Sequence, residues 1–233
     1  MYTTISSVYD YIFPQNPKQL AFIESIQAID EDDSIIEIGA ATGNLTDLLM
    51  SKSKNVIGLD LDEGLLEVAK KKYPSYQFVH KNMLEINQMD THFDKVICFG
   101  NTLVHLPNRD LVQTFLNAVY ESLNKDGYLI TQIINYDRIQ ENKIDHLSTI
   151  DNQHIEFKRT YVLHDEYLDF NTELLIKSSD QRIDNSIPLL TLRREEIRQM
   201  LIKSGFTNIK FYGGLDGSQV TSNSVPLLFS CQK

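Results

Sequence analysis

The apolar positions of residues 34–50 change their spacing part-way along the segment. Ile35, Ile36 and Ile38 form an almost continuous apolar run, which is typical of a strand buried on both faces of a parallel sheet. Small residues and two glycines follow, and residues 45–50 then have the spacing of an amphipathic helix. A strand, a tight turn of small residues and a helix form the first half of a nucleotide-binding βαβ unit.

The alternation of strand and helix patterns continues to residue 134. Short apolar runs predict strands, and amphipathic spacing between them predicts helices, one of which ends at Pro74. Residues 125–127, Lys-Asp-Gly, predict a turn before the last strand of this series. Strands that alternate with helices indicate an α/β fold with a parallel sheet. The predicted strands cover residues 55–60, 76–80, 93–99 and 128–134, and the predicted helices cover residues 63–73 and 111–123.

The N-terminal segment lies outside this alternation. Residues 1–30 form an arm with an aromatic stretch that ends at Pro14 and a helix pattern that begins at Pro17. Such an arm can cover a ligand as a lid, or it can pack against the sheet. The two interpretations are equally supported for Tyr9, whereas packing is favoured for Phe13.

The segment of residues 138–192 also breaks the alternation. It is polar and only partly alternating, so it predicts a β-rich insertion of hairpins that covers the substrate. The insertion is too short to build a large core of its own, and we therefore expect a single domain over residues 1–233. A helix closed by Gly205 and two further strands are expected at residues 194–203, 207–212 and 225–231.

Composition and charge limit the classes of partner. The chain has 233 residues and a net charge of −10, which argues against a nucleic-acid partner because such binding rests on clustered Lys and Arg. No apolar run approaches about 20 residues and the N-terminus lacks a signal pattern, so no membrane partner is expected. Cys98 and Cys231 lie in apolar runs as buried thiols, which indicates a cytoplasmic protein. No Cys/His spacing predicts a metal site, and a homodimer is left open.

The loop after the first strand has the spacing acid-x-Gly-x-small-x-Gly. It consists of Glu37, Gly39, Ala41 and Gly43. A dinucleotide fingerprint that starts at Gly39 would need glycine at positions 41 and 44, where the chain has Ala41 and Asn44. The spacing therefore argues against NAD, and an ordinary strand-to-helix turn is the alternative interpretation.

The second strand ends in a carboxylate. Asp60 follows Gly39 by about 20 residues, the spacing at which an acid accepts hydrogen bonds from the ribose hydroxyls of an adenosine. Asp62 is the rival candidate. Its place just before the predicted helix of residues 63–73 favours a helix N-cap instead.

Together these features resemble the class I S-adenosylmethionine-dependent methyltransferases, whose motif I reads E/D-x-G-x-G-x-G. The chain departs from the family at Ala41, which replaces a glycine, and at Asn82, which replaces an acid that holds the adenine amino group. The resemblance implies a Rossmann-like sheet of seven mostly parallel strands with the last strand antiparallel, helices on both faces, and S-adenosyl-L-methionine as the cofactor. The cofactor-binding residues that it implies are Glu37, Gly39, Ala41, Gly43, Asp60, Leu61, Asn82, Met83, Phe99, Gly100 and Tyr9.

A narrower resemblance lies where two later strands end. Residues 100–107, GNTLVHLP, and residues 135–137, NYD, are similar to the G-N-S-F-A-H-L-P and R-N-Y-D motifs of glycine N-methyltransferase. This likeness implies that Asn101 contacts a small-molecule acceptor, with Tyr136 as a weaker substrate ligand. The arginine that grips the glycine carboxylate in that enzyme is replaced by Ile134, which cannot form a bidentate clamp. We therefore expect an amine acceptor, with free glycine a poor substrate.

Methyl transfer from a sulfonium is an in-line displacement, so the protein mainly positions donor and acceptor and excludes water. Asn101 and His105 are the candidate catalytic residues, because each can take or orient the proton of an amine. Packing of His105 under its loop is equally supported, and Asp137 and Arg138 are as consistent with a local turn pair as with substrate ligands. A small-molecule O-methyltransferase and a non-catalytic S-adenosylmethionine-binding module are the alternatives. The chain lacks an N/D-P-P-Y/F stretch, which disfavours a nucleic-acid methyltransferase.

Overall fold

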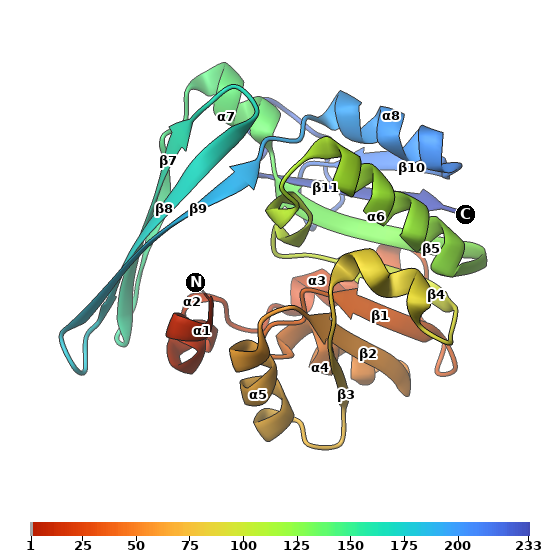
Figure 1. The fold of residues 1–233 in the computed structure, drawn as a ribbon, viewed down its shortest axis with the longest axis horizontal. Coiled ribbons are helices and arrows are strands. Elements are labelled where there is room, and N and C mark those ends of the chain that lie inside the picture. Colours follow the sequence, from red (N-terminus) through yellow and green to blue (C-terminus); the bar gives the residue numbers. More distant parts are fainter. Residues whose placement is uncertain (1) are drawn as a thin grey trace.

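The computed structural model describes residues 2–233, with side chains from residue 4 onward. Its centre is a seven-stranded sheet in the order β3-β2-β1-β4-β5-β11-β10 (Figure 1). Only β11 runs against both of its neighbours, so the prediction of a mostly parallel sheet with its last strand reversed is confirmed. The strands are β1 (Ser34–Ile38), β2 (Asn55–Asp60), β3 (Gln77–His80), β4 (Phe93–Cys98), β5 (Leu123–Ile134), β10 (Thr207–Tyr212) and β11 (Pro226–Gln232).

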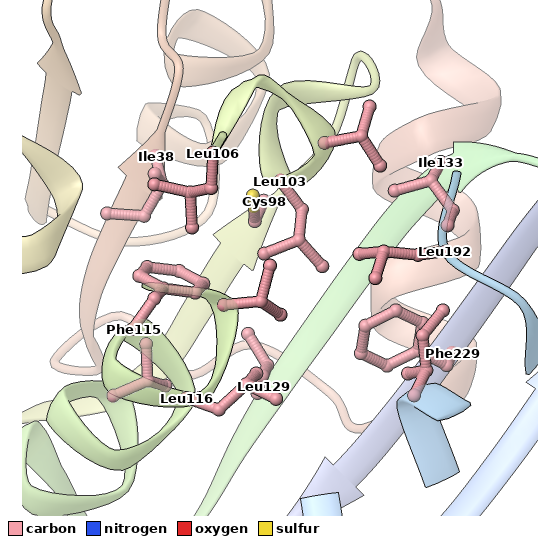
Figure 2. Close-up of a cluster of buried hydrophobic side chains, with 14 of the residues drawn as sticks. Ile38, Cys98, Leu103, Leu106, Phe115, Leu116, Leu129, Ile133, Leu192 and Phe229 are labelled. Carbon is pink, nitrogen blue, oxygen red and sulfur yellow. The ribbon is translucent and has the colours of Figure 1, made fainter. Parts of the chain in front are cut away.

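Helices cover both faces of this sheet because successive strand residues point to opposite sides. Ile35 of β1 packs with side chains of α3 and α4, whereas the next residue, Ile36, packs in a second cluster with side chains of α6 and α8. Figure 2 shows part of the second cluster, in which Phe115 and Leu116 of α6 lie over Leu129 of β5. The helices are α3 (Pro17–Ile26), α4 (Asn44–Met50), α5 (Glu63–Lys72), α6 (Arg109–Ser122) and α8 (Arg194–Ser204), with the short 3-10 helices η2 (Met83–Gln88) and η3 (Thr102–His105).

The insertion is a second, four-stranded antiparallel sheet in the order β6-β7-β8-β9. It stands at one side of the body in Figure 1, and buried side chains of β7, β8 and β9 join the core cluster of α6 and α8. The prediction of hairpins is confirmed, but the segment opens with a helix, α7 (Tyr136–Asn142), because the Asn135 side chain accepts a hydrogen bond from the Arg138 N–H and caps it. Its strands are β6 (His146–Asp151), β7 (Ile155–Leu163), β8 (Tyr167–Ile176) and β9 (Gln181–Leu190).

The N-terminal arm consists of α1 (Tyr2–Ile5), η1 (Ser6–Val8) and α2 (Tyr9–Ile12). It lies between α5 and the far part of the insertion sheet (Figure 1). Ile5, Val8 and Ile12 pack with Phe157 and Leu174 of that sheet. The ring of Phe13 also packs against Phe157, with centroids 6.2 Å apart, so the packing partner is the insertion and not the central sheet.

The turn expected at residues 125–127 is an irregularity inside β5, which already begins at Leu123 and changes its register with β4 there. Cys98 and Cys231 are free and buried, as predicted. In the part of the chain that the structure describes, no helix combines the length and apolar character needed to cross a membrane.

Candidate functional site

The loop between β1 and α4 packs closely against η3. Gly39 has φ +79, and a Cβ added there would come within 2.2 Å of Thr102 Oγ1. Only glycine combines this left-handed backbone with so close an approach. Ala41 is also left-handed, with φ 49, so this alanine carries a backbone strain that the glycine of the resembled motif would avoid.

The carboxylate of Asp60 fastens this loop to the end of β2. One of its oxygens accepts a hydrogen bond from the Ala41 N–H at 2.7 Å, and the other accepts from the Asp62 N–H at 2.8 Å. Burial raises the pKa of Asp60, while these backbone N–H groups lower it. Each oxygen keeps a second lone pair for a ligand hydroxyl. The Asp62 side chain accepts from the Leu65 N–H and caps α5, in agreement with the prediction.

A cavity of about 530 Å³ opens beside this loop at the carboxyl ends of the parallel strands, where open α/β sheets bind ligands. It is also lined by two residues to which the sequence assigned no role: Lys81, which belongs to no recognisable motif, and Thr102, which lies inside the GNTLVHLP stretch. The predicted site residues that line it are Tyr9, Gly39, Ala41, Asp60, Leu61, Asn82, Met83, Gly100 and His105.

Three residues of the predicted cofactor set do not line this cavity. Glu37 is buried and accepts a hydrogen bond from the Thr46 hydroxyl of α4. Gly43, with φ +82, begins α4 against the ring of Phe78. Phe99 packs against Phe22 on the face of the sheet that α3 and α4 cover, with ring centroids 6.4 Å apart. These three shape the loop and its support, and the cavity wall is made by their neighbours.

Asn101 and Tyr136 meet at the next strand ends, although neither lines the cavity. The amide oxygen of Asn101 accepts from the Ile134 N–H at 2.9 Å, and its amide nitrogen donates to the Tyr136 hydroxyl at 3.3 Å. Asn101 has φ 70, a left-handed conformation that asparagine tolerates better than most residues. Its side chain therefore joins the exit of β4 to the end of β5 and to the start of α7.

His105 ends η3 at the rim of the cavity. Burial lowers its pKa to about 4, so the imidazole is neutral at physiological pH. The same side chain borders a neighbouring hollow of about 400 Å³ that contains Tyr167 and Pro188 of the insertion. His105 thus lies where the cavity approaches the insertion sheet.

Comparison with known proteins agrees with this geometry. Residues 35–127 match a family model described as a methyltransferase domain. A protein of Bacillus subtilis (strain 168) that is named as a methyltransferase, YqeM, is 25% identical over 248 residues, which cover 100% of this chain and 97% of that protein. The chain is an S-adenosylmethionine-dependent methyltransferase.

Further similarities extend over most of the methyltransferase. The crystal structure of an S-adenosylmethionine-dependent methyltransferase from Clostridium acetobutylicum has a TM-score of 0.85 at 18% identity, covering 99% of this chain and 98% of that one. An amino pentose methyltransferase from Micromonospora echinaspora has a TM-score of 0.78 at 16% identity, covering 97% and 96%. At these identities the structural likeness shows the fold. A glycine/sarcosine N-methyltransferase from Aphanothece halophytica is 26% identical over 186 residues, covering 77% of this chain and 68% of that protein.

Glu37 of the methyltransferase is a buried acid whose charge is costly. Burial, the largest cause, raises its pKa to about 8 from an ordinary value of 4.5, and the Thr46 hydrogen bond partly opposes this. Because the folded pKa lies above the unfolded one, the stabilisation from the protonated form is complete below about pH 4.5 and is lost as the pH rises towards 8.

We expect the Glu37→Gln variant to be less sensitive to pH in this window. The wild-type free energy of unfolding should fall by up to about 1.4 kcal/mol per pH unit from this group, whereas a glutamine keeps an acceptor for Thr46 and does not titrate. Urea unfolding of both proteins at several pH values measures the difference. Glu24→Gln, which removes the surface ion pair with Lys52, is the control and should leave the wild-type slope intact. If the free energy of unfolding depended on pH equally in the wild type and in Glu37→Gln, the raised pKa of Glu37 would be contradicted.

Asp10 binds the N-terminal arm of the methyltransferase to the loop between β1 and α4. One of its oxygens accepts from the Thr42 hydroxyl and the Asn44 amide, and the other pairs with Lys72 of α5 at 2.8 Å. Tyr9, the preceding residue, lines the cavity. The arm is therefore fixed beside the cavity, by a residue that no motif of the sequence marks.

Removal of this carboxylate should loosen the arm. For Asp10→Ala we expect faster hydrogen exchange in residues 4–13 and a cofactor dissociation rate about three- to tenfold higher, since several exposed charge-assisted bonds each contribute modestly. Exchange mass spectrometry and stopped-flow dissociation measure these effects. Asp32→Ala breaks the exposed ion pair with Lys54 and should change neither quantity. An unchanged dissociation rate in Asp10→Ala would mean that the arm does not cover the cofactor.

Proposed function

We propose that this methyltransferase transfers a methyl group from S-adenosylmethionine to a neutral amine of a small molecule. The observation that carries the proposal is the position of half-buried, neutral His105 at the rim of the cavity, next to the insertion. In this proposal the acceptor lies between the exit of β4, the start of α7 and the inner face of the insertion.

The residue pattern of the insertion sheet supports a covered acceptor site. Two rows of paired residues cross its inner face, Phe157-Leu174-Ile183 and Tyr161-Phe170-Ile187. The first row packs on the N-terminal arm and the second on the core of the body. Between them lies a polar row, Arg159-Thr172-Asn185. A sheet that is anchored on both sides and polar in between favours a small polar acceptor held away from bulk water.

The chemistry of the nearby side chains favours positioning over proton abstraction. An amine must be neutral to attack the sulfonium carbon, and the methylated product then loses a proton to solvent. With a pKa of about 4, His105 is a weak base, so it accepts a hydrogen bond from the amine and orients it. The amide of Asn101 already forms two hydrogen bonds. In this proposal it holds Tyr136 and the end of β5 in the position that the acceptor requires.

The similar proteins are consistent with an amine acceptor. The structural neighbours include an amino pentose methyltransferase, and the relatives include a glycine/sarcosine N-methyltransferase. Ile134 stands where the likeness to glycine N-methyltransferase would place an arginine, and its N–H is bound to Asn101. Free glycine is therefore proposed to be a poor substrate.

A turnover screen tests this function. Release of S-adenosylhomocysteine is followed across amines, phenols and carboxylic acids, with Asn101→Ala beside the wild type. We expect turnover of amines and slow turnover of glycine. In Asn101→Ala the turnover rate should fall about tenfold or more, because Tyr136 and the end of β5 are no longer held in place. Asn16→Ala, which removes the N-cap of α3 away from this region, is the matched control. Turnover of phenols alone would favour an O-methyltransferase, and cofactor binding with no turnover would favour a binding module.

A further inference from the structure

Three side chains from α7 and β7 have buried polar atoms without a hydrogen-bond partner among the described residues. They are Arg138, whose Nη1 is unpaired, Arg159, whose Nε is unpaired, and Tyr161, whose hydroxyl is unpaired. Both arginines lower the pKa of Tyr161, which burial raises, so the three side chains act on one another as a group. We call them the arginine cluster. Guanidinium nitrogens only donate, and the Tyr161 hydroxyl can donate as well as accept, so the unused hydrogen-bonding capacity of the cluster is mainly that of donors.

Neither arginine of the cluster forms an ion pair within the part of the chain that the structure describes. The chain has 32 acidic and 22 basic residues, and other arginines pair with carboxylates, such as Arg109 with Glu196 and Arg193 with Asp137. Arg159 instead donates through Nη2 to the Ser148 carbonyl oxygen at 2.6 Å and lies over the Phe157 ring. Burial lowers the pKa of its guanidinium. Buried donors and positive charge without an acid favour an anion as the missing partner.

Two residues of the cluster, Arg159 and Tyr161, lie on the inner face of the insertion, which borders the region proposed for the acceptor. Arg159 belongs to the polar row on the inner face of the insertion, between the row on the arm and the row on the body. Tyr161 begins the row on the body, and its ring packs near Phe170 with centroids 5.8 Å apart. Arg138 lies two residues after Tyr136, whose hydroxyl accepts from Asn101. The same short helix thus connects the cluster to the end of β4.

We propose that Arg138, Arg159 and Tyr161 bind an oxyanion, a carboxylate or a phosphate, that the methyl acceptor carries. Two planar guanidinium forks and a hydroxyl suit the several acceptor oxygens of such a group. The inference rests on the proposed function for the identity of the ligand. Because the cluster belongs to α7 and β7 and not to position 134, the anionic group is separated from the reacting amine by more than the single carbon of glycine.

Matched acceptors test the anion site through turnover. Glycine, β-alanine and γ-aminobutyrate are compared with their amides, which carry the same amine without the carboxylate. We expect the two longer acids to exceed their amides in kcat/KM by about tenfold to a hundredfold, through KM, and Arg159→Met to abolish this preference for the acid over its amide. Lys158→Met removes a positive charge from the outer face of β7, and this variant should still prefer the acids over their amides. Acids no better than their amides, or a preference that survives in Arg159→Met, would overturn the proposal.

Binding of inorganic phosphate tests the site without turnover. Thermal unfolding is measured in phosphate and in chloride at equal ionic strength, because a ligand of the native state raises the midpoint. We expect phosphate to raise the midpoint of the wild type and of Lys158→Met, and to have no such effect on Arg138→Met, Arg159→Met or Tyr161→Phe. Equal shifts in all five proteins, or none in the wild type, would overturn the anion site. Lost phosphate protection without turnover of any acceptor would support the site and contradict the proposed function.

Discussion

Replacement of Asp60 by alanine is expected to weaken S-adenosylmethionine binding by about a hundredfold. The carboxylate is the proposed acceptor for the ribose hydroxyls, and each charge-assisted hydrogen bond contributes on the order of 1.5–3 kcal/mol. The substitution also removes the acceptor for the Ala41 N–H, so the loop under the cofactor loses its attachment to β2. Titration calorimetry with S-adenosylmethionine and S-adenosylhomocysteine measures the affinity.

A neighbouring variant separates the two acids at the end of β2. Asp62→Ala removes the N-cap of α5 and should cost about 1 kcal/mol of stability with little change in affinity. Its backbone N–H still donates to Asp60. Unchanged affinity in Asp60→Ala together with weakened binding in Asp62→Ala would move the ribose site to Asp62, which also borders the cavity.

Replacement of Gly39 by alanine is expected to reduce both stability and cofactor affinity. Its left-handed φ disfavours any Cβ, and that Cβ would overlap the Thr102 side chain, so we expect a loss of stability on the order of 2–4 kcal/mol. Cofactor affinity should fall at least tenfold, since Gly39 lines the cavity. Urea unfolding and calorimetry measure the two effects.

Two companion variants divide this effect into its causes. Gly217 has φ +75 with no atom within 4 Å of an added Cβ, so Gly217→Ala should show the backbone cost alone. Thr102→Ala in the Gly39→Ala background removes the Oγ1 overlap and should recover part of the stability but not the affinity. Recovery of full affinity in the double variant would mean that Gly39 does not approach the cofactor directly.

The sequence predicted the parts of the site that depend on local pattern. The strand, loop and helix around Gly39, and the carboxylate of Asp60 at the next strand end, follow from spacing alone, and the structure brings both to one cavity. Asn135 precedes a helical segment, and an asparagine in that place is a typical N-cap. The N-cap interpretation would have predicted α7.

Contacts between distant segments were beyond the reach of the sequence. Asp10 binds Thr42 and Asn44, more than thirty positions away, and no periodicity relates them. The close approach of Gly39 to Thr102, which leaves no space for a Cβ, depends on how two loops from different strands cross. The polar row through Arg159 becomes visible only when the register of three strands is known, because each strand alone contributes a single residue to it.

The attachment of the arm on two sides has a kinetic consequence. Asp10 fixes it to the cofactor loop, while its apolar residues pack on Phe157 and Leu174 of the insertion. In the proposed function, an opening of the arm that admits the donor therefore also loosens the side of the insertion that borders the acceptor. We expect both substrates to enter while the arm is open and the arm to close before the methyl group is transferred. Turnover then cannot exceed the rate at which the arm opens.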